Sequence, residues 1–186
     1  MASASQPRRK YHVFLSFRGP DSRDNIISHL YDALDGRGIY TYIDIQELKK
    51  GERISDGLMN AIEESRIALI VFSEQYATSS WCLKEVAKIM ECRKTNGLLV
   101  LPVFFKVDPR EVRGGRESYK NAFDAYKNKC KSGKAVGFDL KDVEKWEKAL
   151  FHAGGLSGWV YNKGVIVESK TGTLIQLESG EDEWVF

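Results

Sequence analysis

Several features that define other classes of protein are scarce or missing in this sequence. It has three cysteines and no Cys-x-x-Cys pair, so neither a disulfide framework nor a cysteine metal site is expected, and reduced thiols in a reducing compartment are favoured. No apolar run approaches the ~18 residues of a membrane span, and the first residues lack the apolar stretch of a secretory signal. We therefore expect a cytoplasmic protein without a membrane segment or a bound metal.

The sequence also lacks an excess of charge of one sign, because 28 basic side chains are nearly balanced by 26 acidic ones. This balance makes a nucleic-acid or membrane surface an unfavoured interpretation. Residues 1–10 are expected to be a flexible leader. The basic run Arg8, Arg9 and Lys10 within it has two interpretations, a weak nuclear address or a solvated arm before the first strand.

Motifs of the common nucleotide-binding and nucleophilic enzymes are missing as well. There is no Gly-x-x-x-x-Gly-Lys-Ser/Thr loop for P-loop hydrolysis and no Gly-x-Gly-x-x-Gly clamp for a dinucleotide cofactor. The apolar run that ends at Phe72 is followed by Ser73 and not by the Asp of a phosphoacceptor. The three histidines are scattered along the chain, so neither a metal cluster nor a nucleophile–histidine pair is evident.

The sequence does have a regular alternation of short apolar segments and amphipathic segments. Runs of β-forming residues predict strands at residues 11–17, 39–43, 66–72 and 98–107, with a weaker fifth at 159–161. Helical spacing of apolar residues predicts helices at residues 26–34, after Ser55, from Ser79 or Ser80 to Lys94, and at 119–128 and 140–153. This alternation predicts an α/β fold, a flavodoxin-like doubly wound parallel sheet of four to five strands with about five helices.

Three local features complete the prediction of one domain over residues 11–160. Pro102 inside the fourth strand favours an edge position or a bulge. The Gly-rich stretch after Asp108 and Pro109 is predicted to be irregular. Residues 161–186 form an atypical tail, in which the alternation over 165–177 is compatible with a hairpin or with a mobile segment.

Two loops are expected to meet at one edge of this sheet. In open α/β sheets, ligands bind outside the carboxyl ends of the strands, at the point where the strand order reverses. With a flavodoxin-like order that point lies between the first and third strands, so residues 17–23 and 73–80 converge there. Arg18 and Arg23 could bind phosphates in this crevice, and Gly19 allows close backbone approach.

The helix after the second of these loops carries a candidate catalytic carboxylate. Helical spacing predicts that its sheet-facing residues are Leu83, Val86, Ala87 and Met90. The residues on roughly the opposite side are Trp81, Glu85, Ile89 and Cys92. In one interpretation, Trp81 packs under a loop and Glu85 is an ordinary surface carboxylate. In the other, the aromatic ring stacks on a base or sugar, and an apolar wall raises the pKa of the neighbouring carboxyl group for catalysis.

The same segments carry a family resemblance. The motifs are VFLSFRG at residues 13–19 with Asp21 and Arg23, RIALIVFSEQYA at 66–77, WCLKEV at 81–86 and LPVFFKVDP at 101–109. In this order they resemble the TIR domain of plant intracellular immune receptors, or of a TIR-only relative, from about Tyr11 to Trp159. The resemblance implies a flavodoxin-like fold with five strands and five helices.

The resemblance also implies an activity, the hydrolysis of the nicotinamide–ribose bond of NAD⁺ or NADP⁺. The catalytic carboxylate of the family corresponds to Glu85. The implied substrate-binding residues are Arg18, Gly19, Asp21, Arg23, Ser79 and Trp81. NAD⁺ would be consumed as a substrate, so no cofactor is expected. The alternative is a non-catalytic assembly or adaptor module, which needs neither Glu85 nor Trp81.

Gating and self-association are further implications of the resemblance. Residues 44–54 match a loop that gates the pocket in the family, and its candidate residues are Asp44, Lys49, Gly51 and Ile54. Association of the chain with itself is implied for the first helix, packing against a last helix like residues 140–153. The candidate residues for association are Ser28, His29, Lys145 and Glu117. Without the resemblance, the outer face of the first helix would be interpreted as merely solvated.

The sequence departs from the family at two places. Glu117 stands where the family usually has a Gly before the helix at Tyr119, so a second association surface there is expected to be altered. After residue 165 the chain does not continue into the nucleotide-binding domain of the receptors, which suggests either a truncated or variant product or a TIR-only protein. The expectation is an NAD⁺ hydrolase that is weak until it assembles and then signals immune cell death.

Overall fold

The computed structural model describes residues 9–19, 26–43, 56–114, 117–162, 165–168 and 174–176. The strands form one sheet in the order β2-β1-β3-β4-β5-β6-β7. They are β1 (Tyr11–Phe17), β2 (Thr41–Ile43), β3 (Ser65–Phe72), β4 (Leu99–Phe105), β5 (Trp159–Asn162), β6 (Val165–Glu168) and β7 (Leu174–Gln176). Strands β1 to β5 run parallel, so the flavodoxin-like order and the weaker fifth strand are both confirmed.

Strands β6 and β7 extend the sheet beyond β5 as an antiparallel pair. Val160 of β5 lies opposite Val167 of β6, and Val167 lies opposite Leu174 of β7. Of the two alternatives for residues 165–177, the hairpin is therefore the one observed.

The helices agree with the predicted ones except at one place. They are α2 (Ser28–Asp35), α3 (Asp56–Glu63), α4 (Ser80–Thr95), α5 (Pro109–Gly114), α6 (Glu117–Lys131) and α7 (Leu140–Gly154). Helix α5 corrects the prediction of an irregular stretch. Pro109 begins this helix at a position where the missing N–H of proline is no loss. Asp108 Oδ1 accepts a hydrogen bond from Arg110 N at 2.7 Å and caps the first turn.

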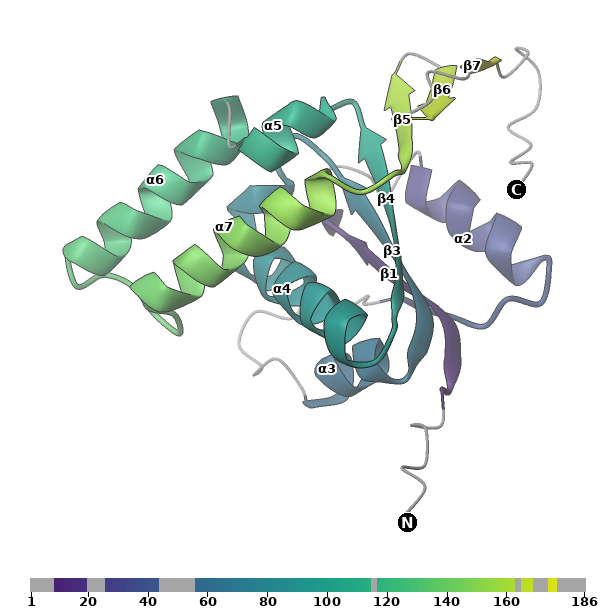
Figure 1. Cartoon of the computed structure of the whole chain (residues 1–186), viewed down its shortest axis with the longest axis horizontal. Coiled ribbons are helices and arrows are strands. Elements are labelled where there is room, and N and C mark those ends of the chain that lie inside the picture. Colours follow the sequence, from purple (N-terminus) through teal and green to yellow (C-terminus); the bar gives the residue numbers. More distant parts are fainter. Residues whose placement is uncertain are drawn as a thin grey trace.

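The helices are distributed unequally over the two faces of the sheet (Figure 1). Helices α3 to α7 pack on one side, which we call the multi-helix face, and α2 packs on the other side, the α2 face. Strand β1 contributes to both cores because successive side chains alternate. Phe14 joins the core of the multi-helix face, and Val13 and Leu15 join the core under α2.

The connections explain why α2 and α7 lie on opposite faces. The chain moves from β1 to β2 in one direction along the sheet, and from β2 through β5 in the other direction. Crossovers of one handedness then place their helices on opposite faces. Ser28 and His29 therefore lie on the opposite face of the chain from Lys145 (Figure 1). The expected packing of the first helix against residues 140–153 would join two copies of the chain, and it stays a prediction.

Helix α4 is buried on almost all sides, which corrects its predicted one-sided burial. The prediction that Glu85, Ile89 and Cys92 lie away from the core is wrong, because each is at most 4% exposed. Helix α7 lies over α4 (Figure 1), and its Trp146 and Leu150 belong to the same core cluster. A one-face helical pattern cannot anticipate this second covering layer. It also misplaced Glu85, which contacts Ser16 of β1 and therefore lies on the sheet side of α4.

Pro102 lies inside the sheet, which corrects the prediction of an edge position or a bulge. Strand β4 pairs with β3 and with β5, and its register with β3 runs without interruption from Leu99 to Phe104. The carbonyl oxygen of Pro102 faces Gly158, since a Cβ atom at that glycine would lie 2.1 Å from it. The N and O atoms of one residue point to the same neighbour in a parallel strand. The missing N–H of Pro102 therefore faces the segment just before β5 begins.

Candidate active site

A buried chain of hydrogen bonds lies at the carboxyl ends of β1 and β3. Ser16, near the end of β1, donates from Oγ to Glu85 Oε2 at 2.5 Å. Its Oγ also lies 2.8 Å from the hydroxyl oxygen of Tyr76, which begins the short helix η3 (Tyr76–Thr78) after β3. Ser16 and Tyr76 are fully buried, and Glu85 is 4% exposed. A contact of 2.5 Å is typical of a hydroxyl that donates to an ionised carboxylate.

Local structure brings these residues together. Ser16 follows Phe14 by two positions, so strand alternation turns its hydroxyl onto the multi-helix face. Ser79 begins α4 as its N-cap, as predicted, and its Oγ accepts a hydrogen bond from Cys82 N at 3.3 Å. Cys82 Sγ donates to the carbonyl oxygen of Phe17 at 3.5 Å. This contact ties the first turn of α4 to the end of β1.

Two tyrosines of α6 hold the loop that carries Tyr76. Tyr119 donates its hydroxyl hydrogen to the carbonyl oxygen of Ser73 at 2.8 Å. Tyr126 donates to the carbonyl oxygen of Thr78 at 2.7 Å. The two hydrogen bonds bracket η3, so the position of Tyr76 is set by α6 as well as by β3.

The electrostatics of this region keep the tyrosines neutral. Burial first, and then the proximity of Cys82 and Glu85, raise the pKa of Tyr76 well above its ordinary value. Burial raises the pKa of Tyr126 to about 12, and the charge of Arg18 opposes that shift. Tyr76 is therefore a hydrogen-bond donor at neutral pH, and the guanidinium of Arg18 lies close enough to α6 to act on Tyr126.

Four of the predicted substrate-binding residues are described, and they lie at the same edge of the sheet as Glu85. Arg18 and Gly19 follow β1 directly, while Ser79 and Trp81 stand at the start of α4. Trp81 is 38% exposed, one helical turn before the buried Glu85. An accessible aromatic ring and a sheltered carboxylate thus lie one turn apart in the first half of α4. The contacts of these residues with a substrate stay a prediction.

Other residues named by the sequence lie elsewhere. Outside the described residues are Asp21 and Arg23, and the gating-loop residues Asp44, Lys49, Gly51 and Ile54. Ser28 and His29 are exposed on α2. Lys145 of α7 donates to Glu91 Oε2 of α4 at 3.0 Å, and Glu117 is the first residue of α6. Their roles in gating or association stay predictions.

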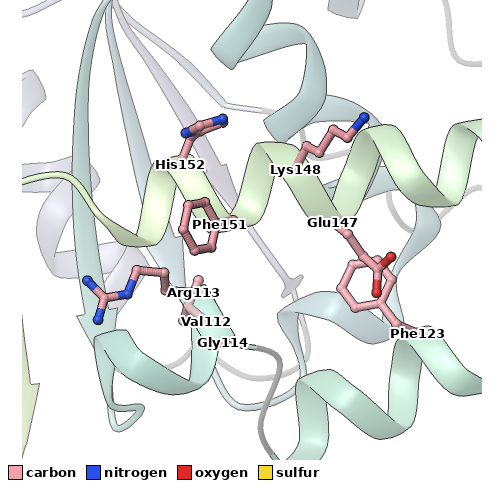
Figure 2. Close-up of a pocket in the computed structure, with 8 residues that line it drawn as sticks. All are labelled: Val112, Arg113, Gly114, Phe123, Glu147, Lys148, Phe151 and His152. Atoms are coloured by element: carbon pink, nitrogen blue, oxygen red, sulfur yellow. The ribbon is translucent and has the colours of Figure 1, made fainter.

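A hollow of about 300 Å³ lies apart from this chain of hydrogen bonds, between α5, α6 and α7 (Figure 2). Figure 2 shows the side chains of Arg113, Lys148 and His152 pointing in different directions, so they do not converge on one bound group. Every lining residue comes from these three helices: Val112, Arg113, Gly114, Phe123, Glu147, Lys148, Phe151 and His152. The hollow is therefore separate from the site around Glu85. Within the described ranges, no group of three or more His, Cys, Asp or Glu side chains could hold a metal ion.

Sequence reasoning missed two members of the site, Ser16 and Tyr76. One signal was available for Ser16, which is a polar residue on the same face as Phe14 within the apolar run at residues 13–17. Tyr76 carries no comparable signal, because an aromatic residue after a strand is ordinarily packing material. The contacts join residues that are 60 and 69 positions apart in the chain.

Comparison with known proteins assigns a family to this fold and site. The family model described as the TIR domain matches residues 10–171. The chain is 44% identical over 162 residues to the TMV resistance protein N of Nicotiana glutinosa. It is 48% identical over 149 residues to the disease resistance protein RPV1 of Vitis rotundifolia. The chain belongs to the TIR domain family.

The matches cover most of this chain and little of the relatives. They span 87% and 80% of this chain, but 14% of protein N and 10% of RPV1. Among solved structures, the TIR domains of the activated Roq1 resistosome, which directly recognises the pathogen effector XopQ, are 41% identical to this chain. The TM-score is 0.71, over 83% of this chain and 89% of that one, and it confirms the α/β fold. No helix in the described part of the chain is long and apolar enough to cross a membrane.

Proposed function

We propose that this TIR domain cleaves the nicotinamide–ribose bond of NAD⁺ or NADP⁺ with Glu85 as its catalytic carboxylate. The observation that carries the proposal is the burial of Glu85 beside a hydroxyl donor at the carboxyl ends of β1 and β3. Ligands of open α/β sheets bind at this edge. A purely structural role would be served better by an apolar side chain, because a buried carboxylate is destabilising unless it is hydrogen-bonded or paired.

In the proposed reaction, the bond between ribose C1′ and the nicotinamide nitrogen breaks, and nicotinamide leaves with the bonding electron pair. The nitrogen is positively charged in NAD⁺, so nicotinamide departs as a neutral molecule without a general acid. The ribose gains oxocarbenium character, which the Glu85 carboxylate stabilises by its charge or captures as a nucleophile. Water then adds at C1′ and loses a proton, which gives ADP-ribose. NAD⁺ is consumed and is therefore a substrate and not a cofactor.

The residues around Glu85 have separate tasks in this proposal. The exposed ring of Trp81 stacks on a base or sugar of the substrate. Arg18, together with Arg23, binds the phosphates, since guanidinium groups bind them bidentately. Gly19 leaves room for the substrate next to the backbone, while Asp21 and Ser79 complete the binding site.

The relatives support a role in plant immunity. Protein N and RPV1 are resistance proteins, and the Roq1 structure contains the TIR domains of an activated resistosome. We assign the activity to an assembled state, in which several copies order the loop at residues 44–54 and the reaction leads to cell death. The proposed association surfaces are two. In one, α2 with Ser28 and His29 packs against α7 with Lys145 of another copy; the other lies at the start of α6, where Glu117 stands.

The test compares nicotinamide release by the wild-type chain with release by Glu85→Gln, at concentrations at which the chain assembles. Glutamine keeps the shape of the side chain and removes the charge, so release should fall at least about 100-fold. The matched control is Glu64→Gln, which lies in the turn before β3 at the opposite end of the sheet and should release nicotinamide like the wild type. Chromatography measures nicotinamide, and urea unfolding checks that both variants fold.

Two results would contradict the proposal. An assembled wild-type chain that releases no nicotinamide would leave the adaptor interpretation in its place. Equal release by Glu85→Gln and the wild type would keep the activity and remove Glu85 from the mechanism.

A further inference from the structure

We propose that Ser16 and Tyr76 are positioning residues, which hold Glu85 ionised and in a fixed direction through a chain of hydrogen bonds from Tyr76 to Ser16 to Glu85. This inference rests on the proposed function, in which Glu85 acts as a carboxylate. It gives Ser16 and Tyr76 a role in the reaction that acts through Glu85 and not through contact with the substrate.

The direction of the chain follows from its hydrogen atoms. A serine hydroxyl has one hydrogen, and Ser16 gives it to Glu85 Oε2 at 2.5 Å. The 2.8 Å contact between Ser16 Oγ and the Tyr76 hydroxyl oxygen then needs the tyrosine hydrogen. All donors therefore point toward Glu85, which matches an ionised carboxylate because that group only accepts.

The opposite direction is geometrically less favourable. A protonated Glu85 would donate to Ser16, Ser16 to Tyr76, and Tyr76 to the carbonyl oxygen of Cys82. The 2.5 Å contact between Ser16 and Glu85 is present in both directions, so the two arrangements differ in where Tyr76 donates. The tyrosine hydrogen spans 2.8 Å to Ser16 Oγ in the ionised state and 3.2 Å to the carbonyl oxygen of Cys82 in the protonated state, and shorter contacts are stronger.

The surroundings hold this chain in place. The ring of Tyr76 packs edge-on against Phe72, with 4.9 Å between the ring centroids. Tyr119 and Tyr126 bind the loop on both sides of it. The donors thus stand in position before any substrate arrives, and preorganised donors avoid reorganisation during the reaction.

The titration of Glu85 can be distinguished from that of the titratable groups next to these hydrogen bonds. From the described elements they are Tyr76 of η3, Cys82 of α4 and Tyr119 of α6, and Arg18 follows Ser16 by two residues. Tyrosine, thiol and guanidinium groups ordinarily titrate above neutral pH, and carboxyl groups below it. Among these described groups, Glu85 is the one expected to titrate on the acid limb of the pH profile of kcat/KM.

Ser16→Ala removes the donor that stabilises the charged form of Glu85. Loss of such a donor raises the pKa of a carboxyl group, so the acid limb should move up by about one pH unit. We expect kcat to fall about 10-fold with little change in KM, because the lost contact acts on the reacting group and not on substrate binding. Tyr76→Phe should move the limb in the same direction by less, because Ser16 can still donate.

The double variant separates positioning from packing. Tyr76 acts through Ser16, so Ser16→Ala with Tyr76→Phe should be no slower than Ser16→Ala alone. Independent packing defects would instead multiply. Losses of kcat that multiply in the double variant, with an unmoved acid limb, would overturn the proposal. If Ser16→Ala does not fold, Tyr76→Phe alone still tests it.

A measurement without turnover distinguishes this proposal from the proposed function. Carbon-detected NMR of the chain labelled at its glutamate carboxyl groups follows the titration of Glu85, which Glu85→Gln identifies by removing its signal. We expect the titration midpoint to lie higher in Ser16→Ala than in the wild type. An unchanged midpoint would overturn the positioning role even in an active enzyme. A raised midpoint in a chain that releases no nicotinamide would contradict the proposed function alone.

Discussion

The two faces of the sheet bury their side chains at different depths. On the α2 face, α2 is the described helix that covers the strands, and Leu15, Leu30 and Val71 form part of a single apolar layer. On the multi-helix face, α4 lies between the sheet and α7 (Figure 1). The second layer covers the side of α4 that faces away from the sheet, whereas Glu85 is sheltered on the sheet side, where Ser16 of β1 donates to it. The difference shows how α4 can bury residues on two sides and hold a carboxylate at the carboxyl ends of β1 and β3.

The largest expected effect on stability is at Gly158, in the short connection from α7 on the multi-helix face to β5 in the sheet. Gly158→Ala would place a Cβ atom 2.1 Å from the carbonyl oxygen of Pro102, and neither backbone segment can give way. We expect a loss of about 5 kcal/mol or more in the free energy of unfolding, or no folding. Gly155→Ala, where the nearest atoms are 3.5 Å away, should stay within about 0.5 kcal/mol. Urea denaturation measures both, and equal stability of the two variants would contradict the close approach of β4 and β5.

A matched pair of leucines tests the two faces directly. Leu83 in α4 and Leu30 in α2 are 0% and 2% exposed. Leu83→Ala leaves a cavity between two packed layers and should lower the free energy of unfolding by about 4 to 5 kcal/mol. Leu30→Ala should lower it by about 2 to 3 kcal/mol, because a single covering helix can move to fill the space. Equal losses in urea denaturation would mean that the second layer does not stiffen the multi-helix face.

The smallest effect on stability is expected at the exposed outer sides of the two faces. His29→Ala on α2 and Lys145→Ala on α7 should each change the free energy of unfolding by less than about 1 kcal/mol, since the 3.0 Å pair of Lys145 with Glu91 is exposed. Each should nevertheless weaken self-association and nicotinamide release together. Because the two residues lie on opposite faces of one chain, their effects on the free energy of unfolding should add. If either variant sediments like the wild type at high protein concentration, the substituted residue does not belong to a proposed association surface.

Local patterns predicted much of this molecule because their causes are local. Strands β1 and β3 follow from runs of β-forming residues, and the start of α4 follows from the capping hydroxyl of Ser79. The errors have causes beyond the local segment. Pro102 is tolerated inside the sheet because β5 has not yet begun beside its missing N–H. Glu85 is buried in contact with Ser16 of β1, which lies 69 positions earlier in the chain.

The sequence by itself determined the family and the succession of strands and helices, and it named Glu85 and Trp81 as candidate site residues, because motif order, side-chain period and capping residues are properties of short stretches. Only the tertiary structure decided that Glu85 is buried, that Ser16 donates to it while contacting the Tyr76 hydroxyl, and that α2 and α7 stand on opposite faces. The physical reason is that these features depend on strand order and crossover direction, which bring together residues more than 60 positions apart.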